Sequence, residues 1–277
     1  MRVTSTVDAY LGLAAIDDDR RRRAAWTATY EAAYRGIFET YYRAWGKRER
    51  SLAAAGEVPR LAPTMREVEQ RARSLVQHTE RSFRATGLLD DDLDVVLLVG
   101  GHTSNGWVTE LDGRDVLFLA LEFLGDPPYD GVLVSHEAFH VAHARHGAGE
   151  WTEDCSASLF QEGIAVAISR ELHPGLPESA YLWFDGRHET WVADCERART
   201  KIATRALAEL DTPYDDLLVR VLFTVQDGER DLPPRAGYWL GDLLLRRLLD
   251  RHPARELLGW DHVAARRALA HELRELI

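Results

Sequence analysis

Residues 136–140 read His-Glu-Ala-Phe-His, an arrangement that places a carboxylate next to one of two closely spaced imidazoles. On a helix, positions i and i+4 share one face about one turn apart, so His136 and His140 could hold one zinc ion. Glu137 stands beside that face, where it could take a proton from the water that the metal activates. The motif therefore predicts a zinc centre with Glu137 as general base.

A catalytic zinc ion needs a third protein ligand and keeps one position for water. His146 would complete the HExxHxxxxxH spacing of the metzincins, but His143 stands where those enzymes have a glycine. Metzincins also carry a methionine downstream of the motif, whereas both methionines of this chain, Met1 and Met65, lie upstream. These two departures argue against His146 as the third ligand.

The second candidate for the third ligand is Glu162, which lies in the apolar run of residues 159–168. A carboxylate in such a run is costly unless it is paired or coordinated. Gly163 beside it lowers helix stability by roughly 1 kcal/mol relative to Ala, which suggests that another element packs closely there. The 21 residues between His140 and Glu162 suffice for a loop and a returning helix. We predict that Glu162 is a ligand; an ion pair with an arginine is the alternative.

An HExxH motif followed by Glu-Gly-x-Ala some twenty residues later resembles the gluzincins, the thermolysin-like and aminopeptidase-like zinc peptidases. More narrowly, the chain resembles a bacterial family of predicted zinc-dependent proteases of unknown function. The resemblance implies a gluzincin fold, bound Zn²⁺, and the roles already given to His136, Glu137, His140 and Glu162. It covers roughly residues 95–250 and rests on five stretches: 100–105, 119–122, 135–140, 160–165 and 237–241.

One position departs from the thermolysin-like pattern, in which an Asp one turn after the ligand Glu supports the first His. This chain has Val166 there. Metal-bound histidines are oriented by a partner on their other ring nitrogen, so another residue must take that part. Asp154, Ser158 and Ser169 are the candidates between which the sequence does not choose.

Hydrolysis of a carbonyl group also needs a donor for the oxyanion that develops, besides the metal. Gluzincins commonly supply a Tyr or a His from the C-terminal half. Tyr238 is our candidate, because the stretch GYWLG at residues 237–241 opens a predicted helix after two prolines. The alternative for Tyr238 is a packing role, and His188 is a second candidate for the donor.

An edge strand before the HExxH helix pairs with extended substrate backbone in this superfamily. Strand addition of this kind would suit residues 106–111, with Asn105 and Trp107 near the cleft as substrate-binding residues. An ordinary hairpin strand is the alternative interpretation.

The elements that must position these residues begin with an N-terminal helical region. Residues 24–45 repeat aromatic side chains at three- and four-residue steps, and residues 64–85 form a second predicted helix. Gly56, Pro59 and Pro63 are expected to break the helical pattern between them.

The remaining elements are a small sheet and a helical C-terminal half. Residues 94–122 predict a small, mainly antiparallel sheet, because Asp112-Gly113 between two apolar runs is a hairpin signal. Everything after Asp130, the expected cap of the HExxH helix, reads as helical. The fold class is therefore α+β with helix dominant. We place an N-terminal helical region at residues 1–92 and the zinc catalytic domain at 93–277.

Composition limits the classes of partner. The chain of 277 residues has a formal net charge of −11, which disfavours nucleic acid and anionic membranes as partners. Its one basic run, Arg20–Arg23, directly follows three aspartates and reads as a solvated helix face. No signal peptide and no apolar stretch near the ~18 residues of a membrane span is visible. Cys155 and Cys195 read as reduced thiols, so we expect a cytoplasmic protein.

The sequence predicts a zinc-dependent hydrolase, a metallopeptidase by resemblance. Two alternatives remain open. The same zinc site could act on a small-molecule amide, ester or specialised metabolite, since nothing in HExxH excludes it. The fold could also serve as a non-catalytic zinc-binding module, although an intact Glu137 argues against that reading. The substrate and the oligomeric state are not predicted.

Overall fold

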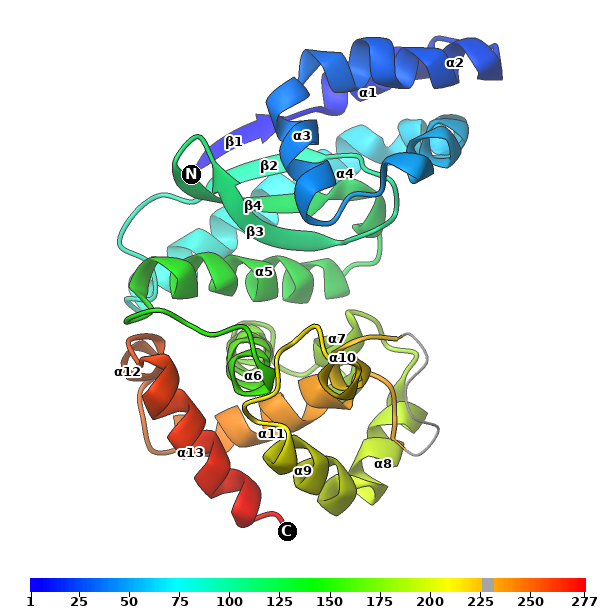
Figure 1. Cartoon of the computed structure of the whole chain (residues 1–277). Coiled ribbons are helices and arrows are strands. Elements are labelled where there is room, and N and C mark those ends of the chain that lie inside the picture. The colour runs from blue at the N-terminus through cyan, green and yellow to red at the C-terminus, as the bar shows by residue number, and fades with distance from the viewer. Residues whose placement is uncertain (226–231) are drawn as a thin grey trace. The chain divides into compact units, whose positions relative to one another are not determined.

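A four-stranded sheet organises the first half of the chain in the computed structural model, which describes residues 1–225 and 232–277 (Figure 1). The strand order is β1-β2-β4-β3, formed by Arg2–Ser5, Asp94–Leu98, Arg114–Ala120 and Gly106–Leu111 respectively. β2 runs parallel to both β1 and β4, and only β3 is antiparallel to its neighbour. The predicted mainly antiparallel sheet is therefore wrong, because β2 and β4 pair in parallel within the predicted range. Strand β1, whose four residues are partly exposed and carry no apolar run, adds a second parallel pair that the sequence does not predict.

The predicted hairpin is confirmed. β3 and β4 pair in antiparallel register and are joined at Asp112-Gly113, with Leu111 opposite Arg114. Both turn residues have positive φ, 52° and 73°, as a tight turn that follows the strand twist requires. The strand order also places β3 at an edge of this sheet, as the sequence predicted.

Helices surround the sheet in this half of the chain (Figure 1). The N-terminal ones pack against each other through an aromatic cluster in which Trp26, Tyr30 and Phe38 are buried with ring centres 4.9–5.0 Å apart. The helical segments are α1 (Val7–Ala14), α2 (Asp19–Ala25), the π-helical η1 (Trp26–Glu31), α3 (Arg35–Ala44), η2 (Arg48–Arg50), α4 (Ser51–Ala85), η3 (Leu121–Phe123) and α5 (Tyr129–His146).

The predicted break at Gly56, Pro59 and Pro63 is wrong, because α4 continues through all three residues. Proline at position 59 removes the hydrogen bond to the carbonyl of Ala55. Arg22 supplies the missing donor, with its Nε 3.1 Å from that oxygen. Arg22 is only 6% exposed, so the basic run is not wholly a solvated face as expected.

Every regular element that the structure describes after α5 is a helix, as the sequence predicted for the residues after Asp130. These helices are α6 (Cys155–Leu172), α7 (Glu178–Trp183), α8 (Glu189–Arg197), α9 (Arg199–Ala208), α10 (Leu217–Phe223), α11 (Ala236–Leu249), α12 (Ala254–Leu258) and α13 (His262–Arg274). The helix-dominant α+β class is confirmed. Within the described residues, no helix has the length and apolarity to cross a membrane.

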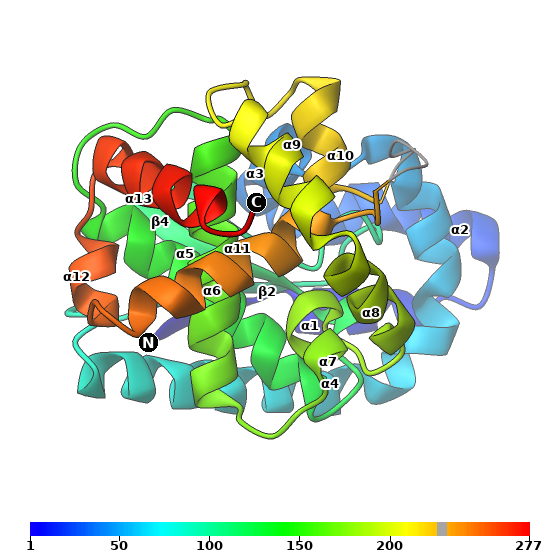
Figure 2. The same cartoon turned by 90° about the horizontal axis from the view of Figure 1, so that it is seen from below.

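Helices α6 and α11 cross at two glycines (Figure 2). A Cβ atom built on Gly163 would lie 2.4 Å from the carbonyl carbon of Gly241. Such a distance is below any real contact, so neither position has room for a side chain. The prediction that another element packs closely at Gly163 is confirmed.

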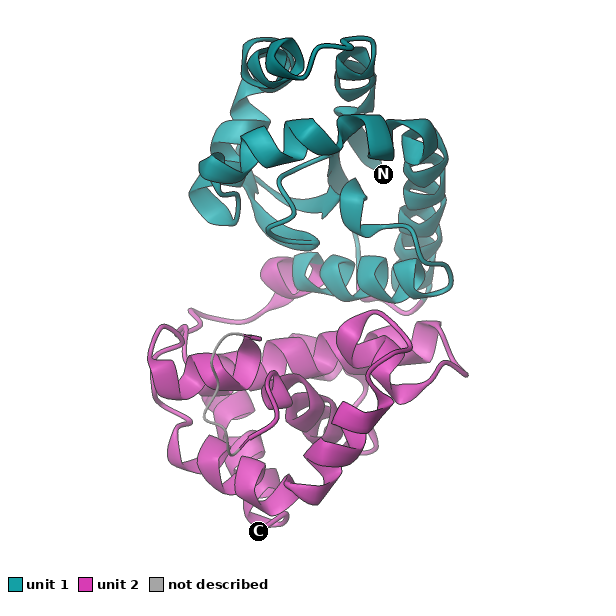
Figure 3. Ribbon diagram, turned by 90° about the vertical axis from the view of Figure 1, so that its right-hand side faces the viewer, with its two compact units in different colours: residues 1–85, 89–141 teal, residues 86–88, 142–277 magenta. Residues whose placement is uncertain are grey.

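The chain divides into two compact units that differ from the predicted domains (Figure 3). Unit 1 contains residues 1–85 and 89–141, and unit 2 contains residues 86–88 and 142–277. The expected boundary between residues 92 and 93 falls inside unit 1, because β1 pairs with β2 and the N-terminal helices pack with the strands that follow. Helix α5 passes from one unit to the other after Val141.

Candidate metal centre

Helix α5 carries the HExxH motif behind a buried apolar lead-in of Val132, Leu133 and Val134. Asp130 lies inside its first turn and is not the cap itself, so that detail of the prediction is wrong. Its carboxylate instead accepts bonds from the backbone N–H groups of residues 125 and 126 and pairs with Arg71 at 2.8 Å. Gly147 follows the last helical residue, as expected.

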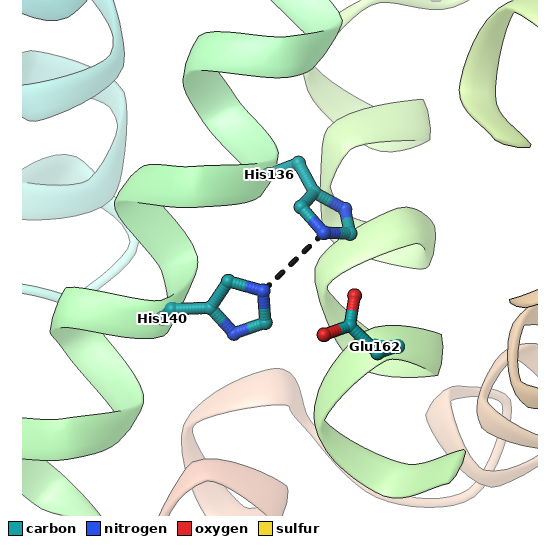
Figure 4. A group of neighbouring side chains, drawn as sticks. All are labelled: His136, His140 and Glu162. Atoms are coloured by element: carbon teal, nitrogen blue, oxygen red, sulfur yellow. Dashed lines mark hydrogen bonds between the residues drawn. The ribbon is translucent and has the colours of Figure 1, made fainter. Parts of the chain in front are cut away.

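His136, His140 and Glu162 form a group that could hold a metal ion (Figure 4). One ligand atom from each residue lies within 4.8 Å of the other two. The Nε2 atoms of the two histidines are 3.3 Å apart. Two Zn–N bonds of about 2.05 Å at a tetrahedral angle place their nitrogens roughly 3.3 Å apart, so the pair has the spacing that zinc requires. Two histidines with one carboxylate form a donor set that suits Zn²⁺.

Helix α6 begins at a strong cap before it reaches Glu162. Asp154 accepts a bond from the N–H of Ala157 at 2.9 Å, and the Oγ of Ser156 donates to the same carboxylate at 2.8 Å. The side chain of His262 lies 3.2 Å from that carboxylate. The glycine contact with α11 then fixes α6 at the position directly after Glu162.

Glu137 is 7% exposed and packs against the first residue of the edge strand. A Cβ atom on Gly106 would lie 2.6 Å from its Cγ, 2.9 Å from its Cδ and 3.3 Å from its Oε1. Only a glycine leaves this space, so the start of β3 sets where the carboxylate of the predicted base can lie.

The loop before β3 is held in place by two side chains of unit 1. Glu122 accepts bonds from the N–H groups of Gly100 and His102, at 2.9 and 3.2 Å. Burial raises the pKa of Glu122 to about 7, although these bonds oppose the rise. The hydroxyl of Tyr41 accepts from the N–H of Gly101 at 2.9 Å and lies 2.8 Å from Thr103 Oγ1.

The two predicted substrate-binding residues lie at the start of β3. The Oδ1 of Asn105 accepts a bond from the N–H of Gly106 at 2.9 Å, and its side chain is partly exposed. Trp107 is only 4% exposed and stacks on Tyr41 and Phe118, with ring centres 5.3 and 5.0 Å away. The structure thus gives Trp107 a place in the core, and its contact with substrate stays a prediction.

The candidate oxyanion donor Tyr238 is partly exposed on α11, whose start after two prolines was predicted. Its ring lies 6.0 Å from that of Phe223, and the guanidinium of Arg235 lies 4.3 Å from its centre. His188 stacks on Trp183 at 4.1 Å.

A second tyrosine, Tyr214, lies within the electrostatic influence of the group and was missed by the sequence reasoning. Burial raises its pKa first, and the carboxylate of Glu162 raises it further, whereas Arg220 and Arg235 lower it. The residue stands in a Thr-Pro-Tyr-Asp turn, whose local pattern carries no signal of a site.

The three candidates for supporting a ligand histidine all form bonds within their own helix or cap. Asp154 is the α6 cap, Ser158 Oγ donates to the carbonyl of Asp154 at 3.1 Å, and Ser169 Oγ donates to the carbonyl of Ala165 at 2.7 Å. None of these bonds reaches His136 or His140.

Comparison with known proteins does not assign the chain to a family. No family model, no curated protein and no solved structure matches this chain.

Proposed function

We propose that this protein is a zinc-dependent hydrolase, and that it cleaves peptide bonds. The single observation that supports it best is the grouping of His136, His140 and Glu162 at metal-binding distances, with the buried carboxylate of Glu137 next to the first ligand. Three protein ligands with one position left for water are typical of catalytic rather than structural zinc sites. A binding module has no use for a base at this position.

A bound zinc ion would polarise the substrate carbonyl and acidify water. Glu137 would accept the proton of the attacking water and return it to the leaving amine. Its low exposure and its contact with Gly106 restrict the positions of its carboxylate. A neutral phenol would donate to the developing oxyanion, with Tyr238 as the predicted donor and Tyr214 as a second candidate. A tyrosine phenol is protonated at neutral pH, and burial and Glu162 raise the pKa of Tyr214 further.

The peptide substrate is favoured by the edge strand, since β3 ends the sheet and starts at the residue that contacts Glu137. Extended backbone added along β3 would thus pass close to the base. A small-molecule amide or ester at the same zinc site remains the alternative substrate. We also propose a cytoplasmic location; both cysteines are free and buried, which is compatible with it.

Metal analysis tests the site directly. The purified wild type should bind about one zinc ion per chain, and a His136→Ala/His140→Ala variant should bind none, because the metal loses two of its three protein ligands. Wild-type zinc content in the double variant would refute the metal site. The Glu137→Gln variant should keep the zinc and lose hydrolysis of a peptide mixture followed by mass spectrometry. Unchanged turnover would remove Glu137 from its role.

A further inference from the structure

The guanidinium of Arg235 is held between two aromatic rings of unit 2. Its Cζ lies 4.6 Å from the ring centre of Trp183 and 4.3 Å from that of Tyr238. Trp183 in turn stacks on His188, nearly parallel at 8°, and the Nδ1 of His188 lies 2.7 Å from Asp185. Stacking on ring faces leaves the edge of a guanidinium, where its N–H donors point, open to a partner.

The backbone of Arg235 adopts a conformation that a non-glycine residue rarely takes. Its φ and ψ are 60° and 19°, in the left-handed region, which costs a non-glycine residue roughly 1–2 kcal/mol. Both sides of the residue are fixed: the carbonyl of Pro234 accepts a bond from Trp191 Nε1 at 2.7 Å, and that of Arg235 accepts from Tyr238 N–H at 3.1 Å. Strain of this kind is found where a side chain must be aimed at a site.

Among the described residues, no acidic side chain is paired with the guanidinium of Arg235. Arg170 of the same unit pairs with Glu178 at 2.7 Å and with Asp242 at 2.8 Å. No carboxylate of residues 1–225 or 232–277 forms an ion pair with Arg235, whose guanidinium contacts the two rings. A guanidinium whose N–H donors have no protein carboxylate as partner is suited to bind the carboxylate of a ligand.

Arg235 and the proposed zinc ligand of α6 belong to the same unit and are connected through α11. It directly precedes α11, six residues before Gly241, and six residues of helix rise about 9 Å. Gly241 contacts Gly163, the neighbour of Glu162. Tyr214 is influenced by both groups, since Glu162 raises its pKa and Arg235 lowers it.

We propose that Arg235 binds a carboxylate of the substrate and so makes this enzyme selective for acidic peptide ends. The inference rests on the proposed hydrolytic function of the same site. The carboxylate is either the free C-terminus of the substrate or the side chain of one of its Asp or Glu residues.

The test uses one peptide mixture made in three forms: with free C-terminal carboxylates, with C-terminal amides, and with amides plus one Glu at each position in turn. Initial rates are measured for zinc-loaded wild type, Arg235→Lys and Arg235→Gln. The wild type should cleave peptides with a suitably placed carboxylate about tenfold or more faster than neutral amides. Arg235→Gln should abolish this preference, and Arg235→Lys should keep part of it, because an ammonium lacks the planar fork. The form that is preferred distinguishes the C-terminus from a side chain.

Arg220→Gln is the matched control, because Arg220 also lowers the pKa of Tyr214, whereas the guanidinium that lies over Trp183 and Tyr238 is that of Arg235. It should keep the preference, and zinc content with circular dichroism should show that each variant is folded. Equal rates for acids and amides in the wild type, or an unchanged preference in Arg235→Gln, would overturn the proposal.

Binding to zinc-loaded Glu137→Gln protein separates this inference from the proposed function. Titration calorimetry with the same free-acid and amide peptides needs no turnover. If the free-acid peptides bind more tightly than the amides, and Arg235→Gln removes this difference, the inference is supported even when the wild type hydrolyses nothing. If acids and amides bind equally, the inference is refuted even when the wild type is active.

Discussion

Gly106 offers the sharpest test of the proposed base, because a single methyl group there would occupy the space of Glu137. The Cβ of Gly106→Ala would lie 2.6 Å from Cγ and 2.9 Å from Cδ of that side chain. Carbon atoms in contact need about 3.5–4.0 Å, so the carboxylate must retreat by roughly 1 Å. A displacement of this size at a reacting group costs on the order of 10²-fold in rate. We expect kcat to fall about 100-fold.

The ligands should be less affected than the base, so zinc content separates the two effects. Gly106→Ala should retain about one zinc ion per chain while its turnover of the peptide mixture approaches that of Glu137→Gln. Gly36→Ala is the control, because a Cβ on Gly36 meets nothing within 4 Å. It should leave turnover unchanged. A Gly106→Ala enzyme with full kcat, alongside an inactive Glu137→Gln, would refute the claim that the start of β3 positions the base.

Three further predictions concern stability. Gly163→Ala should lower the free energy of unfolding by about 3 kcal/mol or more in urea titration, because its Cβ would meet the backbone of Gly241 at 2.4 Å, where no side chain can yield. Gly36→Ala should instead raise the free energy of unfolding by up to about 1 kcal/mol. A loss of stability in this variant would contradict the conclusion that a methyl group at position 36 meets no other atom. Burial holds the pKa of Glu122 at about 7 in the folded protein, above the ordinary value of 4.5. The folded state therefore keeps a proton that the unfolded chain loses, so this stabilisation is complete below about pH 4.5 and is lost as pH rises to 7. It amounts to at most about 3 kcal/mol. Urea titrations at pH 5 and 7.5 should show a smaller loss for Glu122→Gln than for wild type; equal losses would exclude Glu122 as the cause.

Local signals were the part of the fold that could be predicted from sequence. The hairpin at Asp112-Gly113 was found because two adjacent residues with positive φ demand particular residue types. The strand Arg2–Ser5 was not, because its parallel partner lies some ninety residues away and leaves no local pattern. The break predicted at the prolines of α4 is wrong for the same reason. The donor that compensates for Pro59 is the side chain of Arg22, which lies 33 residues before Ala55, whose carbonyl it bonds.

The candidate site shows the same division between local and distant signals. The helical spacing of His136 and His140 made their proximity predictable, and Glu162 was found because a carboxylate and a glycine interrupt an apolar helix. Tyr214 and Arg235 gave no such signal. Each depends on tertiary neighbours, the carboxylate of Glu162 for one and the rings of Trp183 and Tyr238 for the other.

The contact between Gly106 and Glu137 has a consequence for how this chain can vary. In the proposed mechanism, α5 and α6 supply the residues that would hold the metal, while the first residue of β3 contacts the carboxylate of the proposed base. We therefore expect substitutions at the start of β3 to change the position of the Glu137 carboxylate more than the spacing of the three proposed ligands.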